Sequence, residues 1–166
     1  FNEIDQHLIN TKDIFIYLRD IQRLKKWSVK GEFKETELIK DHYSFLEKLN
    51  AYYTAFYQFL KQKKIGYQGL IYREACSNID NYLEKHKNKQ LFFIGFNALN
   101  KAEELLFQKV LENNNSEIYW DIDQTFFKDN HQAGKFIRKY KSTWRYYEKN
   151  DSKTLGNAFL SEKNIQ

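Results

Sequence analysis

The sequence predicts a mostly helical α/β fold, in which a helical region (residues 1–89) precedes a small α/β piece (residues 90–166). Apolar residues recur at helical spacing through most of the first region, which predicts amphipathic helices. Two short apolar runs in the second region have the length of strands, and a helical pattern lies between them. A strand, a helix and a strand in so short a stretch predict parallel pairing through a right-handed crossover.

Length and composition indicate one globular domain with a single core. The chain has 166 residues, of which 42% are hydrophobic and 30% charged, as is typical of a soluble protein. No apolar run approaches the roughly 18 residues of a membrane span and no signal peptide is visible, so we expect a cytoplasmic protein without membrane contact. Cys76 is the single cysteine, which excludes an internal disulfide. Because methionine is absent, we interpret the chain as a fragment of a longer protein.

The first helical pattern spans residues 4–27, with residues such as Ile14 and Ile21 on its apolar face. Thr11 and Asp13 are suitable capping residues for a break within this run, so the pattern allows one long helix or two short ones. A polar link that contains Gly31 follows.

The longest helix is predicted from Glu37 to Lys63, with Thr36 as its N-cap. Its apolar stripe is wide, so we expect it to pack against more than one neighbour. The lysines in residues 61–64 suit the negative end of the helix, which ends before Gly66. A further helix is predicted from Tyr67 to Lys87.

The organising segment of the second region is residues 90–127. Residues 91–96 form an apolar run typical of a strand that is covered on both faces. Asn100 is a candidate N-cap for the following helix, and Glu103 fits a capping box with it. Residues 118–120 are predicted to form the second strand. Gly95, at the end of the first strand, suggests either a positive φ or a close backbone approach.

Beyond this segment, Asp129 or Asn130 is expected to cap a helix that runs to about Glu148. The stretch from residue 150 onward looks loosely ordered, and residues 163–165 resemble the start of another strand. Two strands alone make an inadequate sheet. We therefore expect either that further chain supplies more strands or that the helices cover these two.

Ligands of open parallel sheets bind at the carboxyl ends of the strands. Here those ends carry residues 95–97 and 121–124. The sequence has no glycine-rich phosphate loop, and its histidines have no metal-ligand spacing with one another or with Cys76. Cys76 is expected to be a small buried helix residue.

The stretch Asp121-Ile122-Asp123-Gln124-Thr125 follows an apolar strand and resembles the first motif of the haloacid dehalogenase-type phosphatases. That resemblance implies a magnesium-dependent phosphohydrolase, in which Asp121 attacks phosphorus and Asp123 handles the proton. Those phosphatases have a later acidic loop, which is missing from the helical stretch that follows here. The alternative is two solvated carboxylates in a strand-end turn.

The formal net charge of +5 and the isoelectric point near 9.1 permit nucleic-acid contact. The abundance of Lys, Asn, Ile, Phe and Tyr, as in proteins of AT-rich genomes, accounts for this charge equally well. Since no base-reading element is evident, we expect any DNA binding to be weak and electrostatic. The candidate contacts are cations at helix ends: Arg23, Lys25, Lys26, Lys61, Lys63 and Lys64.

A second resemblance covers roughly residues 37–138. Residues 92–104, 118–123 and 133–138 resemble, in order and spacing, the helicase-like half of AddB-type proteins, the B subunits of bacterial AddAB helicase–nucleases, particularly the Bacteroidetes form. The resemblance implies a role in DNA double-strand-break repair and recombination. It also implies an AddA-like helicase subunit as partner, and a PD-(D/E)XK exonuclease in another part of a parent protein.

The same region is similar to superfamily 1 helicases, whose motor is a P-loop NTPase domain. In those motors the first strand ends in Asp-Glu, which hold Mg²⁺ and activate the attacking water. This sequence has Gly95 and Phe96 there, and Ala98 and Leu99 where the motors carry Gln and Asp. None of these side chains binds a metal or accepts a proton.

After the second strand the motors carry Gly-Asp-x-Asp-Gln-Ser, whose Gln senses the terminal phosphate. This sequence keeps Asp121, Asp123, Gln124 and a hydroxyl at Thr125, with Trp120 in place of the Gly. The comparison implies a degenerate helicase domain, or pseudo-ATPase, with no catalytic residue, metal or cofactor in this segment. Such a segment would hold DNA or act as a scaffold. A third interpretation is a helical scaffold that binds only protein.

Overall fold

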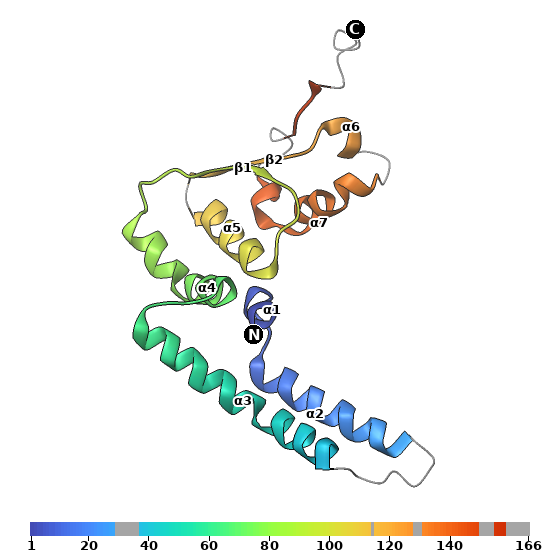
Figure 1. Ribbon diagram of the computed structural model, residues 1–166. Coiled ribbons are helices and arrows are strands. Elements are labelled where there is room, and N and C mark those ends of the chain that lie inside the picture. The colour runs from blue at the N-terminus through green and yellow to red at the C-terminus, as the bar shows by residue number, and fades with distance from the viewer. Residues whose placement is uncertain (29–36, 114, 128–130, 150–154, 159–166) are drawn as a thin grey trace. The chain divides into compact units, whose positions relative to one another are not determined.

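The computed structural model describes residues 1–28, 37–113, 115–127, 131–149 and 155–158. The chain forms two compact units, Phe1–Arg73 and Glu74–Gln166. The described residues are mostly helical with one parallel two-stranded sheet, which confirms the predicted α/β class (Figure 1). The division between the units falls within helix α4 (Gln68–Lys85). Among the described helices, none is both long and apolar enough to cross a membrane.

In the first unit, the helical pattern of residues 4–27 forms two helices, α1 (Asn2–Gln6) and α2 (Thr11–Ser28). The break lies at Leu8, which has a positive φ of 53°. Asn10 caps the start of α2, since its side-chain oxygen accepts the backbone N–H of Lys12 at 3.0 Å. The cap therefore precedes the two residues suggested by the sequence.

Helix α3 spans Glu37–Lys63, as predicted, and packs against α2. Its end is a Schellman turn, in which Ile65 N–H donates to Leu60 O and Lys64 N–H donates to Lys61 O, both at 3.1 Å. Lys64 occupies the left-handed position, with a φ of 56°. The expected link at Gly31 and the expected cap at Thr36 lie outside the described residues.

A buried carboxylate anchors α1 to the rest of the first unit. The Asp5 side chain is fully buried and accepts hydrogen bonds from the hydroxyls of Tyr53, at 2.5 Å, and Tyr67. Arg73 donates its Nε–H to the same carboxylate at 2.5 Å. Arg73 also donates to the backbone oxygens of Ile4 and Ile9, so one charged cluster joins α1 to α3 and α4.

The second unit contains the predicted strand–helix–strand segment as β1 (Phe92–Phe96), α5 (Lys101–Asn113) and β2 (Glu117–Trp120). The strands pair in parallel, with Phe92 opposite Glu117 and Phe96 opposite Trp120. Helix α4 spans Gln68–Lys85, slightly shorter than the predicted 67–87.

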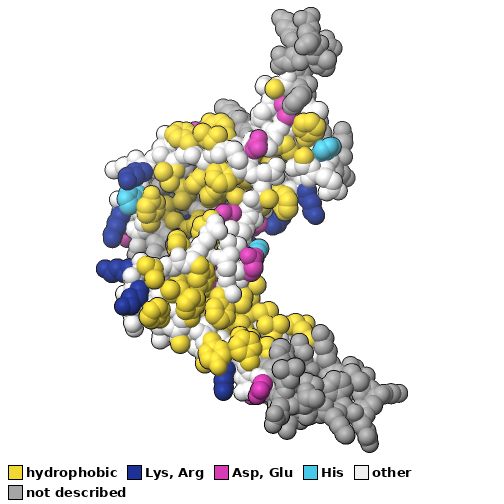
Figure 2. All heavy atoms as spheres, in the orientation of Figure 1, with side chains coloured by type: hydrophobic (Ala, Val, Ile, Leu, Met, Phe, Trp, Pro, Cys, Tyr) yellow, Lys and Arg dark blue, Asp and Glu magenta, His cyan; other side chains and the backbone are white. Residues whose placement is uncertain are grey.

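One face of the sheet covers the core of the second unit, formed by Phe107, Ile118, Trp120, Ile137, Tyr140 and neighbouring residues. The opposite face is open: Phe92 is 54% exposed and Ile94 is 70% exposed. The expectation that this strand is buried on both faces is therefore wrong. Helices α5 and α7 (Lys135–Thr143) lie on one side of the strands (Figure 1), and apolar side chains lie on the surface of the molecule near the strands (Figure 2).

The chain after β2 is more broken than its helical pattern predicts. It forms α6 (Gln124–Phe127), a 3-10 turn η1 (Gln132–Gly134), α7 (Lys135–Thr143) and a second 3-10 turn η2 (Arg145–Glu148). The single predicted helix to Glu148 is interrupted at Trp144, which has extended backbone angles (φ −86°, ψ 127°) and a buried side chain that contacts Tyr140. The expected caps at 129 and 130 and the strand start at 163–165 lie outside the described residues.

A later segment pairs with the chain just after β2. Gly156 N–H donates to Ile122 O at 3.0 Å, and Gln124 N–H donates to Gly156 O at 2.7 Å. These two bonds form an isolated parallel bridge between Asp123 and Gly156. The turn after β2 is therefore hydrogen-bonded to chain that follows η2.

Candidate functional site

The two strand ends that the sequence singled out lie together at the carboxyl edge of the sheet. Asp121 N–H donates to Phe96 O at 2.9 Å, which extends the strand pairing by one residue. The Asn97 side-chain amide reaches Asp121 O at 3.5 Å. The fold thus brings residues 95–97 and 121–124 to one edge, where ligands of parallel sheets bind.

Gly95 and Phe96 present no chemical group at this edge. Gly95 has a φ of +82°, and a Cβ built on it would have no atom within 4 Å. Of the two explanations offered by the sequence, positive φ therefore applies and close backbone approach does not. The strand register shifts between Ile94 and Phe96, as in a bulge. The Phe96 ring packs edge-on against Phe107, with ring centroids 4.9 Å apart.

The two aspartates after β2 differ in environment. Asp121 is exposed, whereas Asp123 is buried at 8% exposure. The Asp123 carboxylate accepts the backbone N–H of Thr125 at 2.8 Å and so caps the start of α6. The expectation of two solvated carboxylates is wrong for Asp123, because the chain turns directly into a helix whose first N–H groups need an acceptor. Gln124 is half-buried and Thr125 is exposed.

The described residues contain no group of three or more His, Cys, Asp or Glu side chains arranged to hold a metal ion. Cys76, expected to be buried, is only half-buried, and its Sγ lies 3.5 Å from the backbone oxygen of Ala102.

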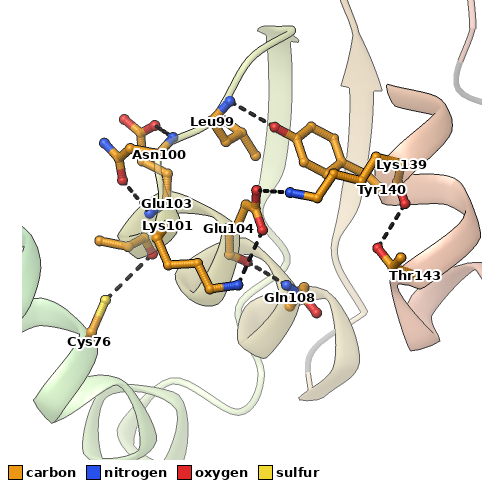
Figure 3. A network of polar contacts seen from close by, with 11 residues as sticks. Cys76, Leu99, Asn100, Lys101, Glu103, Glu104, Gln108, Lys139, Tyr140 and Thr143 are labelled. Atoms are coloured by element: carbon orange, nitrogen blue, oxygen red, sulfur yellow. Dashed lines mark hydrogen bonds and ion pairs between the residues drawn. The ribbon is translucent and has the colours of Figure 1, made fainter. Parts of the chain in front are cut away.

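The first turn of α5 is held by a polar network that joins it to α7 (Figure 3). The Glu104 carboxylate is buried and lies 2.9 Å from Lys139 Nζ and 3.5 Å from Lys101 Nζ. The hydrogen bond to Glu104 raises the pKa of Lys139. The Tyr140 hydroxyl accepts the Leu99 N–H at 2.9 Å, and burial raises the pKa of Tyr140. The sequence analysis did not predict this network. Its one signal in the sequence is the hydroxyl of Tyr140 on the apolar face of α7.

The candidate DNA contacts fall in two places. Lys61 and Lys63 lie in the last turn of α3, Lys64 follows it, and all three are exposed. Lys61 Nζ lies 5.6 Å from the centre of the Tyr57 ring. Arg23, Lys25 and Lys26 belong to α2, but their side chains are outside what the structure describes.

Comparisons with protein-family models, curated proteins and solved structures found no match to this chain.

Proposed function

We propose that this chain is a helicase-like segment of a DNA double-strand-break repair helicase–nuclease, and that it holds DNA or serves as a scaffold without hydrolysing ATP. One observation carries this proposal. At the strand end where a superfamily 1 motor would hold Mg²⁺, Gly95 has no side chain and Phe96 packs against Phe107. A metal-dependent hydrolase needs oxygen or nitrogen ligands at such a position, and neither residue supplies one.

The second strand end supports the same proposal. Asp123 is buried and its carboxylate accepts a backbone N–H, so it stabilises the turn into α6. That role also disfavours the phosphohydrolase alternative, in which Asp123 would exchange a proton with the substrate. The segment needs no cofactor in this proposal.

The wider proposal follows the resemblance to AddB-type proteins. A parent protein would act in the cytoplasm on DNA ends together with an AddA-like helicase subunit, and its nuclease would lie in another part of the chain. Within this segment, DNA would contact exposed cations through its phosphates.

The proposal is tested by measuring ATP and phosphomonoester hydrolysis with Mg²⁺, alongside DNA binding. We expect no turnover from the folded chain, and weak DNA binding that falls steeply with salt. The matched variant is Asp121→Asn, which removes the exposed carboxylate. Turnover that disappears in Asp121→Asn would overturn the proposal in favour of the phosphohydrolase.

A further inference from the structure

The positive charge of the chain is concentrated in α7 and η2. Residues 135–149 contain four lysines, two arginines and one glutamate, a formal charge of +5, which equals that of the whole chain. The remaining residues are therefore balanced overall. This one segment therefore creates a strong positive electrostatic potential around it. The net charge of the chain alone does not show where that potential lies.

Because the apolar face of α7 packs into the core, the lysines on its opposite face point to solvent. Ile137 and Tyr140 are fully buried, and Trp144 is nearly so. The opposite side carries Lys135 and Lys139, both exposed and one helical turn apart. Four residues of α-helix advance about 6 Å, so these two cations are side by side along the helix. Arg145 and Lys149 continue the exposed cations into η2.

Some cations of this segment are already used within the fold. Arg138 donates to the backbone oxygens of Phe127 and His131, and Lys141 lies over the rings of Phe127 and Tyr147. Lys139 shares the Glu104 carboxylate with Lys101, so two ammonium groups surround one buried negative charge and the site stays positive.

The other three cations remain accessible. Lys135, Arg145 and Lys149 have no ion pair with any residue that the structure describes. Arg145 and Lys149 line a surface hollow with Tyr146 and Asn113, in which Glu112 is the acidic neighbour.

We propose that Lys135, Lys139, Arg145 and Lys149 form a surface that binds the phosphate backbone of DNA. The inference rests on the proposed function and deepens it, because it places the DNA contact on α7 and η2. A polyanion with regularly spaced charges suits exposed cations that follow one another along α7 and η2. A membrane surface would instead require apolar side chains beside the cations, and on α7 only Phe136 is a large exposed apolar residue.

The test compares two triple variants that lose equal charge in the same unit. The first is Lys135→Gln, Arg145→Gln and Lys149→Gln. The matched control is Lys85→Gln, Lys87→Gln and Lys89→Gln, exposed lysines at and after the end of α4. Binding of duplex and single-stranded oligonucleotides of equal length is measured by fluorescence anisotropy over a series of salt concentrations, and thermal unfolding establishes that each variant is folded.

We expect the α7–η2 variant to bind duplex DNA more weakly than wild type. Its slope of log affinity against log salt concentration should be shallower by about 2 to 3, because each lost phosphate contact removes about 0.9 from the slope. The control should keep the wild-type slope. Should the triple variant unfold, Lys135→Gln alone is expected to reduce the slope by about 0.9.

The possible failures are distinguishable. If the wild-type chain binds DNA and both triple variants lower its affinity for DNA equally, this inference is overturned and the proposed function stands. A wild-type chain that binds neither oligonucleotide would overturn the DNA-holding function and the inference together. Poly-glutamate or anionic lipid vesicles that compete as well as DNA would also overturn the inference, because the surface would then not be specific for a nucleic-acid backbone.

Discussion

Asn100 and Glu103 exchange two hydrogen bonds across the first turn of α5. The Asn100 side-chain oxygen accepts the Glu103 N–H, and the Glu103 carboxylate accepts the Asn100 N–H, both at 2.9 Å. This reciprocal pair is the capping box that the sequence predicts, and it satisfies two N–H groups that the helix leaves unpaired. It also fixes where the chain leaves the sheet edge and enters the helix.

Replacing Asn100 by alanine should lower the free energy of unfolding by about 1 kcal/mol, because the Glu103 N–H loses its acceptor. Urea denaturation followed by circular dichroism measures this change. Asn97→Ala is the matched control, since the side-chain hydrogen bond of Asn97 to the described part of the chain is a long one, at 3.5 Å. Equal stability of Asn100→Ala and Asn97→Ala would show that the capping box contributes nothing.

Replacing Gly95 should destabilise the second unit through its backbone angle alone. A Cβ at this position meets no neighbouring atom, but a φ of +82° is unfavourable for residues with a side chain. We expect Gly95→Val to lower the free energy of unfolding by roughly 1–2 kcal/mol and Gly95→Asn by less, because asparagine tolerates left-handed angles. Thermal unfolding of the two variants checks this order. A neutral Gly95→Val would contradict the observed φ.

The elements that the sequence predicts well are those with long or strictly local signals. Helix α3 has the predicted bounds because its apolar period extends over many turns, and the capping box depends on residues only three apart. The end of α3 at Lys64 has a different origin. Lysine has no preference for a left-handed conformation, so the path of the chain determines the Schellman turn.

Features built from distant residues were beyond prediction. The Asp5 cluster joins residues 48 to 68 positions apart, and no spacing rule connects them. The burial of Asp123 depends on the four-residue helix α6 and on pairing with Gly156, neither of which has a periodic signal. The open face of β1 was missed because an apolar run cannot show whether one face or both are covered.

Asp5→Asn should destabilise the first unit strongly. The substitution removes the charge that pairs with the Arg73 guanidinium, whose side chain is 22% exposed. Breaking a largely buried ion pair in this way should cost about 2 to 4 kcal/mol. Asp13→Asn, at an exposed position in the first turn of α2, is the control and should be near neutral. The comparison uses urea unfolding, and similar midpoints for the two variants would contradict a structural role for the Asp5 cluster.

The same cluster should make stability fall at alkaline pH. Burial and the hydrogen bond to Asp5 raise the pKa of Tyr53 and Tyr67 above the ordinary value near 10. A folded-state pKa that lies above the unfolded value gives stability that is complete below about pH 10 and is lost as the pH rises further. Tyr53→Phe should therefore show a smaller loss between about pH 8 and pH 11 than wild type, by urea unfolding. Tyr17→Phe, at an exposed position in α2, should behave as wild type.

Asp123 and Asp121, two residues apart, should lose different amounts of stability when their carboxylates are removed. Asp123 is buried and caps α6, whereas Asp121 is exposed. Asp123→Ala should cost about 1 kcal/mol because the Thr125 N–H loses its acceptor, and Asp123→Asn should restore most of that stability, since asparagine also caps helices. Asp121→Ala should change stability by less than about 0.5 kcal/mol. Thermal and urea unfolding of the three variants measure these differences. If Asp123→Ala were as stable as Asp121→Ala, the capping role would be wrong, and the carboxylate would again be available for chemistry at the sheet edge.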